Sequence, residues 1–573
     1  MLRSFEIGLS AIRTHQRALN VIGNNIANAS TPGYHRQEVH LVPRRPELDG
    51  GHYVGTGVEV AEVERVIDQA TEDSILSNNA LLSTAAARLS VAQDIESLLT
   101  PSDSSIHAYV SDFFNNLEAV ANTPEVTTVR RELLTAAENV VYQFDTIDAG
   151  LQEQRQSRIS EISDAVDNIN RLVRDIADLN KKIRIGRALN QEPNDLLDKR
   201  DQLLNELTEV ADVSVQTADN GREIVLLGNG ALTISEDPAG LEVGYDDFGN
   251  VAVYATGPTR HQLNFTSGQL GGLLTAVNET IPEAQARLAQ LAGEIVRAVD
   301  QVHATGLTET GGYNIIRGTR GVDSLTRSLI STGTTFPVNS GDVTVTVTDP
   351  ATGQRTSHRV SINPYFDSIT DIAARFDAID GITASVAADT GRLTLSGDQL
   401  LQIDFAGRVD NIPDLSSYSG TGTPEFSGSY AGSTNDEWTV SFSGAGTIGV
   451  TNGLTAIVTN SAGQVVAQLE VGAGYAAGQP LAIADGVSVS FDNGTVAATD
   501  STSVLVTANS DTSGLLAALG LNSLFEGTNI RSYQVRDDIQ NDYSLLALSR
   551  TGFPGDAANF ARIADLRDSR FDS

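Results

Sequence analysis

The chain has 573 residues, more than one hydrophobic core supports, so roughly three or four domains are expected. It contains no cysteine, which excludes thiol catalysis, disulfide bonds and cysteine-ligated metals. The formal net charge is −35 at pH 7, so the surface repels nucleic acid, and no apolar run is long enough to span a membrane.

The first predicted element is a long helix at the N-terminus. Its apolar residues recur at alternating steps of three and four, which makes a narrow seam of the kind that long helices use to lie along one another. We expect this seam to be an assembly surface that stays exposed until another helix covers it. Its predicted members are Leu2, Phe5, Leu9, Ile12, Leu19 and Ile26.

The helix is predicted to stop in the asparagine-rich loop NNIANASTPGYHRQ, residues 24–37. The stretch 31–34 fits a type II turn, in which Pro32 presets the second position and Gly33 supplies a positive φ at the third. Alternating apolar residues at 39–41 and 55–63 then predict a β-hairpin. The residues that make up this signature turn are Asn24, Asn25, Asn28, Thr31, Pro32, Gly33, Tyr34, Arg36 and Gln37.

Two further segments, 159–183 and 270–302, show the same three-four spacing. Three such helices predict an elongated helical bundle. Pro282 interrupts the last of them and is expected to open a new helix after Thr280. Elsewhere, residues 211–260 and 335–505 alternate around Asn and Gly turns, which predicts strands.

The order of these segments predicts an α+β multidomain fold: an elongated α-helical bundle stalk with inserted β-rich domains. Within the β region, 343–362 predicts two strands around a turn, and 367–386 predicts a short helix leading into a strand. Because an inserted domain exchanges few contacts with its host, we expect 335–505 to be dispensable for the fold of the stalk. The predicted ranges are 1–63 for the N-terminal axial helix and hairpin, 64–210 for the helical stalk, 211–265 for a small β-rich segment, 266–334 for the return of the stalk, 335–510 for the inserted β-rich domains and 511–573 for the C-terminal return to the stalk.

Motifs for catalysis are absent from the sequence. It has no Gly-Lys-Ser/Thr phosphate loop, no H-E-x-x-H zinc motif and no G-x-S-x-G nucleophile elbow. The local histidines His35, His40 and His52 lack neighbouring cysteines and a spaced carboxylate motif, so we interpret them as ordinary loop residues. We therefore predict no catalytic residue, no cofactor, no metal site and no enzyme activity.

The loop NNIANASTPGY at 24–34, after a heptad helix, resembles the signature shared by bacterial flagellar rod, hook and hook-associated proteins. The continuation HRQEV at 35–39 is more similar to the hook-associated protein 1 (FlgK) family than to rod or hook proteins. Segments 194–207, 267–306 and 511–527 also resemble that family, so the resemblance spans nearly the whole chain.

This resemblance implies a structural subunit that joins the flagellar hook to the filament, without a cofactor. It implies export by the flagellar secretion apparatus to the hook–filament junction outside the cell, and no cleavable signal is expected. The implied partners are other copies in a ring, hook subunits, a neighbouring hook-associated protein or filament subunits, and an export chaperone. Neither nucleic acid nor a membrane is among them.

The sequence departs from that family at its end. The family closes with a heptad helix that pairs with the N-terminal one, whereas this chain stops at ARIADLRDSRFDS. We interpret this as a shortened C-terminus that lacks the partner helix. Two alternatives stay open: a hook or rod subunit with the same opening signature, and a surface adhesin or glycan hydrolase carried on a flagellar-type stalk.

Overall fold

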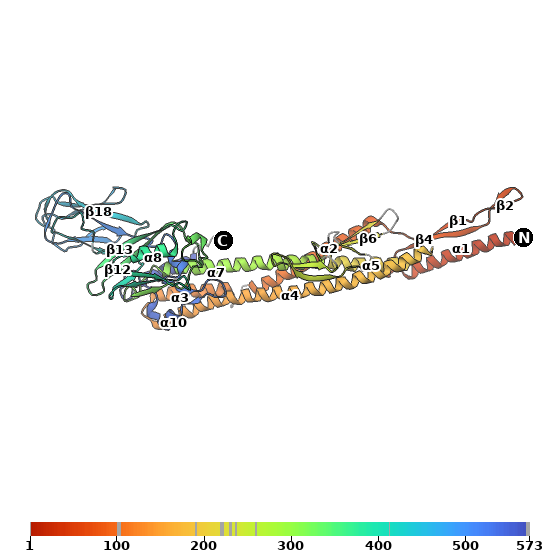
Figure 1. Ribbon diagram of the computed structural model, residues 1–573, viewed down its shortest axis with the longest axis horizontal. Coiled ribbons are helices and arrows are strands. Elements are labelled where there is room, and N and C mark those ends of the chain that lie inside the picture. Colours follow the sequence, from red (N-terminus) through yellow and green to blue (C-terminus); the bar gives the residue numbers. More distant parts are fainter. Residues whose placement is uncertain are drawn as a thin grey trace. The chain divides into compact units, whose positions relative to one another are not determined.

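The structure, a computed structural model, describes residues 2–99, 105–189, 192–217, 223–228, 232–234, 238–257, 260–411 and 413–568. The chain forms two compact units: unit 1 comprises Met1–Leu99 with Ala149–Gln285, and unit 2 comprises Thr100–Asp148 with Ala286–Ser573. The helices α4 (Thr127–Ala188) and α7 (Ile281–His303) contribute residues to both units (Figure 1). The predicted stalk range 64–210 is thus shared between the units. Over the described ranges, no helix has the length and apolar character needed to cross a membrane.

Unit 1 begins with a helix and a pair of strands, which we call the arm (residues 2–65). The helix α1 (Leu2–Ala27) is followed by β1 (Gln37–Pro43), which pairs antiparallel with β4 (Val58–Arg65). The predicted helix and strand pair are confirmed. The register shifts between His40 and Leu41, and a second ladder joins β2 (Glu47–Asp49) to β3 (His52–Val54), so the arm has two ladders where one hairpin was expected.

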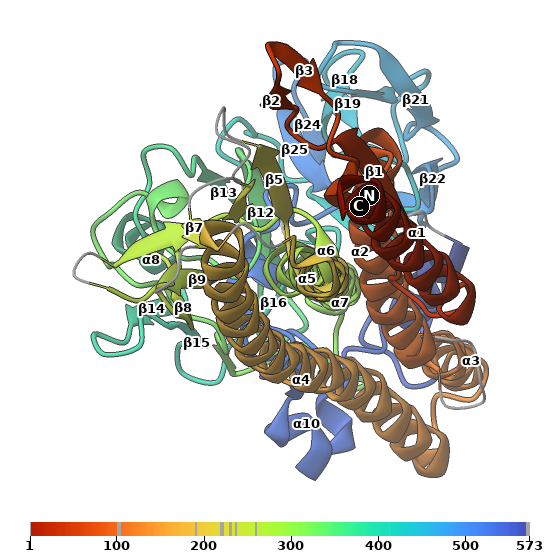
Figure 2. The same ribbon diagram turned by 90° about the vertical axis from the view of Figure 1, so that its right-hand side faces the viewer.

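The core of unit 1 lies among α4, α5 (Asn194–Val210) and two small sheets. The seam predicted over 159–183 is confirmed as part of α4 and is buried there from Ile162 to Ile183. On the other side, α2 (Gln69–Leu99) packs against α5 and α6 (Gly268–Thr275) (Figure 2). The two sheets have the orders β5-β6-β7 and β10-β9-β8 and consist of β5 (Val213–Thr217), β6 (Glu223–Leu227), β7 (Leu232–Ile234), β8 (Leu241–Tyr245), β9 (Val251–Ala255) and β10 (His261–Leu263).

The third predicted helix contains a π-helical turn. It runs from α6 through the π turn η1 (Ala276–Thr280) into α7, which begins at Ile281, one residue before Pro282. The Ile281 N–H donates to the Ala276 carbonyl, five residues back. Proline cannot donate to an ordinary helical turn, so the wider turn lets the helix continue where a break was expected. The turn also places the Asn278 side chain against the backbone of Val251 in β9. The Val251 N–H donates to Asn278 Oδ1 at 2.9 Å, and Asn278 Nδ2 donates to the Val251 carbonyl at 2.8 Å.

Unit 2 joins α3 (Ile106–Asn122), parts of α4 and α7, and a first β module. The strand pair predicted over 343–362 and the short helix and strand predicted over 367–386 are confirmed. This module shares one buried core with Ala304 and with Leu515. Its elements are β11 (Ile315–Arg317), η2 (Leu329–Ser331), β12 (Gly341–Thr348), β13 (Arg355–Ile362), α8 (Ile369–Asp377), β14 (Ile382–Val386), β15 (Leu393–Gly397) and β16 (Gln402–Asp404), in sheets ordered β13-β12-β16 and β11-β15-β14.

A second β module follows and has a core of its own, from Val409 to Val506, around Trp438. The predicted range 335–510 therefore holds two cores, of which only the second excludes the residues before 335 and after 510. Its strands are β17 (Pro424–Gly428), β18 (Asp436–Phe442), β19 (Gly446–Thr447), β20 (Thr455–Thr459), β21 (Val465–Glu470), β22 (Leu481–Ala484), β23 (Val487–Phe491), β24 (Thr495–Val496) and β25 (Ser501–Val506), in sheets ordered β17-β23-β22, β21-β20-β18-β25 and β19-β24.

The last segment of the chain packs against buried polar groups of α7 and of the segment after β11. Asp300 and Arg320 are fully buried and paired, with Oδ2 and Nη2 2.8 Å apart, and the Leu524 N–H donates to the other Asp300 oxygen at 2.9 Å. His303 Nδ1 donates to the Asn522 carbonyl at 2.8 Å, and complete burial lowers the pKa of His303 to about 4. The remaining elements are α9 (Leu515–Leu519), β26 (Phe525–Glu526), β27 (Gln534–Val535), α10 (Asp537–Asn541), η3 (Tyr543–Leu545), α11 (Ala558–Ala564) and η4 (Asp565–Asp568).

Candidate assembly site

Small and polar residues of α1 face the strands of the arm. Ser10 Oγ accepts the Val58 N–H at 3.3 Å, and Thr14 Oγ1 donates to the Val58 carbonyl, also at 3.3 Å. The neighbouring Gly57 must be small, because a Cβ added to it would lie 2.2 Å from the Ser10 Oγ. The helix therefore rests on β4 through small and polar side chains, while several of its large apolar side chains stay exposed.

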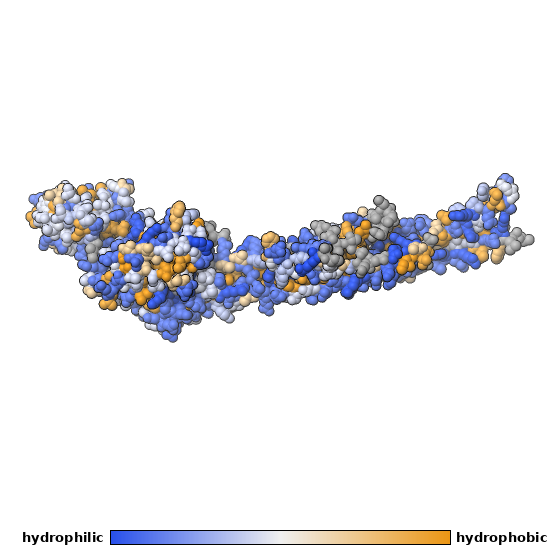
Figure 3. All heavy atoms as spheres, viewed as in Figure 1, coloured by the Kyte–Doolittle hydropathy of each residue, from blue (hydrophilic) through white to orange (hydrophobic). Residues whose placement is uncertain are grey.

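Those apolar side chains form an exposed row, which we call the α1 row: Phe5, Ile12, Leu19 and Ile26, at seven-residue spacing. They are 72%, 59%, 65% and 73% exposed. Leu9 is half-buried, and the side chain of Leu2 lies outside the described residues. Residues coloured as hydrophobic lie among hydrophilic ones along the arm in Figure 3. Because burying one such side chain contributes about 1.5–3 kcal/mol, the row favours contact with another apolar surface.

The asparagines of the signature turn close α1 and fix the start of β1. Asn28 Nδ2 donates to the Asn24 carbonyl at 3.1 Å and to the Asn24 Oδ1 at 2.8 Å. Asn25 binds Gln37 in both directions: its Nδ2 donates to the Gln37 carbonyl at 2.8 Å, and its Oδ1 accepts the Gln37 N–H at 2.9 Å. The Tyr34 hydroxyl donates to the same Oδ1 at 2.8 Å. The Asn25 amide thus pairs with backbone as a neighbouring strand does.

The Pro-Gly turn has the predicted geometry. The Tyr34 N–H donates to the Thr31 carbonyl at 3.2 Å, and Gly33 has a φ of +77°, which confirms the positive φ expected there. The turn lies against α5, where a Cβ on Gly33 would be 3.7 Å from the Gln202 Cβ. A side chain at Gly33 would therefore be strained by its backbone conformation rather than crowded by neighbours.

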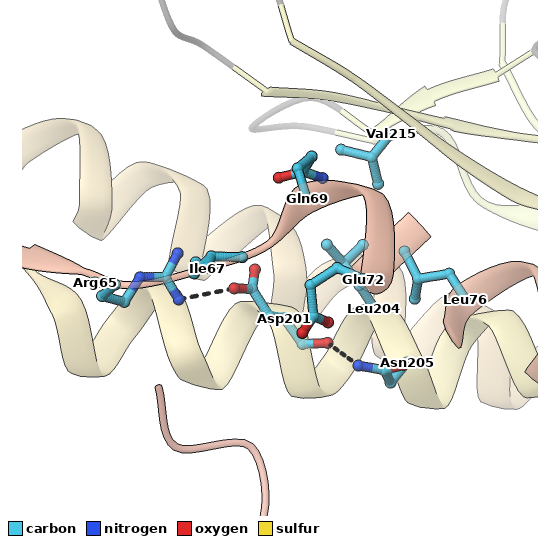
Figure 4. Close-up of a pocket in the computed structure, with 9 residues that line it drawn as sticks. All are labelled: Arg65, Ile67, Gln69, Glu72, Leu76, Asp201, Leu204, Asn205 and Val215. Atoms are coloured by element: carbon cyan, nitrogen blue, oxygen red, sulfur yellow. Dashed lines mark hydrogen bonds and ion pairs between the residues drawn. The ribbon is translucent and has the colours of Figure 1, made fainter. Parts of the chain in front are cut away.

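Beside the turn lies an ionic cluster of His35, Arg65, Glu72, Asp198 and Asp201. Arg65 Nη1, at the end of β4, donates to Asp198 Oδ1 at 2.7 Å and to Asp201 Oδ2 at 2.8 Å. His35 Nδ1 lies 2.8 Å from Asp198 Oδ1, and its Nε2 lies 3.4 Å from Glu72 Oε1. Figure 4 shows Arg65 reaching Asp201 on α5, with Glu72 on α2 nearby. Burial alone would lower the pKa of Arg65, but its bonds to both aspartates raise it.

The cluster ties the arm to α5 and α2 within unit 1. A further bond at the same place joins Asn194 Nδ2 on α5 to the Val63 carbonyl on β4, at 2.7 Å. Arg200 Nη2 lies 3.1 Å from Asp201 Oδ1, so both aspartates have cationic neighbours. The direction of the arm is therefore set at the signature turn and at the end of β4.

The cluster has the side chains of a metal site, but a guanidinium occupies the place of the ion. His35, Asp198 and Asp201 bring ligand atoms within 4.8 Å of one another. Because Arg65 Nη1 already lies within 2.8 Å of both carboxylates, a metal ion would have to displace it. The adjoining cavity, lined by Ile67 and other residues drawn in Figure 4, has a volume of about 50 Å³, far below the roughly 300 Å³ of a small-molecule pocket.

The three histidines grouped by sequence are separated in the structure. His35 joins the ionic cluster, His40 lies near Glu62 and Glu64 on the exposed β1–β4 ladder, and His52 lies in β3. Arg36, also part of the predicted signature turn, is exposed, and its Nη1 lies 3.6 Å from Glu38 Oε2.

Sequence reasoning found the signature turn but missed the α5 residues that receive it. Asn194, Asp198 and Asp201 recur at steps of four and three, which places them on one face of a helix. That spacing places the three polar residues opposite the leucines of the same helix, and this pattern could have indicated a polar contact face. It did not indicate which distant residues would bind there.

Comparison with known proteins gives two family matches. Residues 92–315 match the flagellar hook-associated protein FlgK helical domain, and residues 5–35 match the flagella basal body rod protein family. The helical domain match includes the whole of α4 and α5.

Three relatives share one description, flagellar hook-associated protein 1. The Escherichia coli K12 protein is 28% identical over 418 residues, 69% of this chain and 74% of that protein. The Salmonella typhimurium LT2 protein is 31% identical over 320 residues, 53% of this chain and 57% of that protein. The Bacillus subtilis 168 protein is 25% identical over 452 residues, 71% of this chain and 84% of that protein. Through these relatives and the matching helical domain, the chain is similar to the flagellar hook-associated protein 1 (FlgK) family.

Proposed function

We propose that the chain is a structural subunit of the bacterial flagellum that joins the hook to the filament. The family and the shared description of its relatives support this role, which is structural and not enzymatic. The observation that carries the proposal is the α1 row, exposed on a helix whose opposite face already rests on β4. Such a row is suited to packing along the helices of other subunits.

The signature turn and the ionic cluster position this surface. Asn25 sets where β1 begins, and Arg65 ties the end of β4 to α5. Both contacts hold the direction of α1 without covering the α1 row. The arm therefore holds α1 in position and leaves the α1 row exposed.

The proposed partners are other copies of the chain in a ring, hook subunits, and a neighbouring hook-associated protein or filament subunits. An export chaperone is proposed for the path through the flagellar secretion apparatus. The proposed location is the hook–filament junction outside the cell. The description of the relatives as hook-associated proteins supports a position next to the hook.

A hook or rod subunit is the second candidate, because residues 5–35 match a rod-protein family. The much longer match over 92–315 is to a hook-associated domain and favours the first candidate.

Antibody labelling of isolated hook–basal bodies tests the proposal. In cells that express the gene, we expect label at the distal end of the hook, and a strain without the gene should build hooks but shed filament subunits. Label along the hook or on the rod would support the second candidate. Flagella without any label would refute both.

A further inference from the structure

Within unit 2, the chain crosses between the two β modules at two places that lie side by side. On the way out, Phe405 belongs to the core of the first module and Val409 to that of the second. The way back runs next to it, because a Cβ added to Gly407 would be 3.0 Å from the Thr507 Cβ. We call residues 406–411, with the facing edge of β13, the module seam.

Hydrogen bonds along a strand edge hold this seam together. Since the first sheet has the order β13-β12-β16, β13 is an edge strand, and the outgoing segment covers part of its open edge. The Arg355 N–H donates to Asn411 Oδ1 at 2.7 Å, and Arg355 Nη2 donates to the Val409 carbonyl at 3.3 Å. Ser357 Oγ donates to the Arg408 carbonyl, also at 3.3 Å. The amides at the start of β13 are therefore shielded by the segment that leads into the second module.

Asp410 lies in the middle of the seam with a carboxylate oxygen that is not satisfied. Its Oδ1 atom is buried, and within the described part of the chain no group donates a hydrogen bond to it. The neighbouring cations bind elsewhere: Arg355 Nη2 donates to the Val409 carbonyl, and Arg408 Nη2 donates to Asp404 Oδ2 at 2.6 Å. A buried carboxylate is costly as an anion unless donors surround it. The closed seam therefore favours a protonated Asp410.

The electrostatics of the seam agree with this geometry. Burial raises the pKa of Asp410 to about 7, and the polar groups of Ser357 and the charge of Arg355 offset only part of that effect. The pKa of Arg355 is itself lowered, first by burial and then by the nearby charge of Arg408. The arginines thus weaken one another and leave the carboxyl without full compensation.

The other titratable groups of these elements have separate roles. Asp404 is the partner of Arg408. On β13, Arg359 is exposed, and His358 lies on the opposite face from Ser357, because side chains alternate along a strand. At the start of the second module, the Asp414 carboxylate accepts the N–H of Ser416 at 2.8 Å.

We propose that Asp410 makes the module seam a pH-sensitive hinge, in which the protonated carboxyl lets the two β modules stay joined and its ionisation loosens them. A neutral carboxyl can donate a hydrogen bond and is cheap to bury, whereas the anion gains hydration only if the seam opens. An open seam exposes Asp410 to water and returns its pKa to the ordinary value of 3.8, against about 7 in the closed seam. The closed seam is therefore most stable below pH 3.8 and loses stability as the pH rises to 7. This hinge goes beyond the proposed function and does not depend on it.

Hydrogen exchange of the full chain between pH 5 and pH 8 tests the hinge. Peptides that contain Arg355 and Ser357 report the opening of the seam, once the rates are corrected for intrinsic exchange. With pKa values of 3.8 and about 7 in the open and closed seam, the opening constant should rise about fiftyfold from pH 5 to pH 7 and only about twofold more by pH 8. Peptides from the core of the second module, around Trp438, are the internal reference and should not show this rise.

Two variants separate Asp410 from the general effect of pH. Asp410→Asn keeps the shape of the protonated side chain but cannot ionise, so its seam should open equally at pH 5 and pH 7. The matched control is Asp389→Asn, at an exposed aspartate between β14 and β15, which should keep the wild-type rise. Far-UV circular dichroism verifies that both variants are folded, and the wild-type profile is a test by itself if one of them is not.

The inference is overturned by a wild-type seam whose opening constant is the same at pH 5 and pH 7. It is also overturned if Asp410→Asn keeps the rise, if Asp389→Asn loses it, or if the reference peptides around Trp438 rise equally. The antibody label at the hook tests the proposed function separately, because neither result enters the other.

Discussion

Replacing Arg65 by methionine tests how the arm is held. The guanidinium is the shared partner of Asp198 and Asp201, at 2.7 and 2.8 Å, and its side chain is only 8% exposed. Methionine keeps much of the length of arginine but removes the charge and all the donors. The substitution leaves two largely buried carboxylates with fewer partners.

The expected loss of stability depends on which partners each carboxylate retains. Removing one partner of a buried ion pair destabilises by about 3–5 kcal/mol. Asp198 retains His35, and Asp201 retains Arg200 at 3.1 Å, so the lower end of that range, about 3 kcal/mol, applies. Since about 1.4 kcal/mol is a factor of ten, protection against hydrogen exchange should fall by roughly a hundredfold.

Hydrogen exchange of the full chain measures this fall in protection in peptides from β4 and α5, with peptides of unit 2 as an internal reference. The matched control is Arg171→Met, because Arg171 forms an exposed pair with Asp175 at 3.4 Å on α4. The control should change protection by no more than about twofold, as expected for a surface pair. If Arg65→Met has no larger effect than the control, the ionic cluster does not hold the arm.

Three further predictions concern the turn, the buried histidine and the second β module. Gly33→Val should destabilise the turn by about 1–3 kcal/mol and Pro32→Ala by less, in thermal melting; equal effects would show that the positive φ is unimportant. Because His303 has a pKa of about 4 in the fold and an ordinary value of 6.5 when unfolded, the unfolded chain takes up the proton first. Stability of unit 2 should therefore fall by about 3 kcal/mol from pH 6.5 to 4 in urea titrations, and His303→Asn should remove that dependence. Replacing residues 413–506 by a short Gly/Ser linker should leave the melting of the remaining chain unchanged, because that range holds all of the module's buried core except Val409; a large drop would show a shared core.

Local patterns predicted the arm well. The spacing of Phe5, Ile12 and Leu19 indicated α1, and the Pro-Gly pair indicated a turn with Gly33 at positive φ. These features depend on neighbours in the sequence, and short-range sterics decide them. The same holds for the strand pair at 343–362.

Contacts between distant residues escaped prediction. Arg65 meets Asp198 across 133 positions, and nothing in either local sequence indicates the other. The helix α2 was not recognised as a separate element, because it is apolar on opposite faces: Val91 is buried whereas Leu82 and Leu89 are exposed. A helix of this kind has no single apolar face for a periodicity argument to find.

The division of the β region also needed the structure. Strands from 341–404 and from 424–506 alternate in the same way in the sequence. Only the packing shows that Val343 shares a core with Leu515, whereas Trp438 belongs to a core confined to the second module. Alternation identifies which face of a strand is buried, but not which partner covers it.

The central claim, that the α1 row is an assembly surface of a hook–filament junction subunit, is tested most directly by Leu19→Asp in flagellated cells. A carboxylate in the middle of an apolar helix contact is costly to bury, whereas Asn20→Asp places the same charge beside the row on an exposed position. The measurement is the fraction of filament subunits retained on cells against that released into the medium, with secretion of each variant checked by immunoblot. We predict that both variants are secreted and that only Leu19→Asp releases filament subunits. Filaments retained by Leu19→Asp cells as fully as by Asn20→Asp cells would contradict the claim.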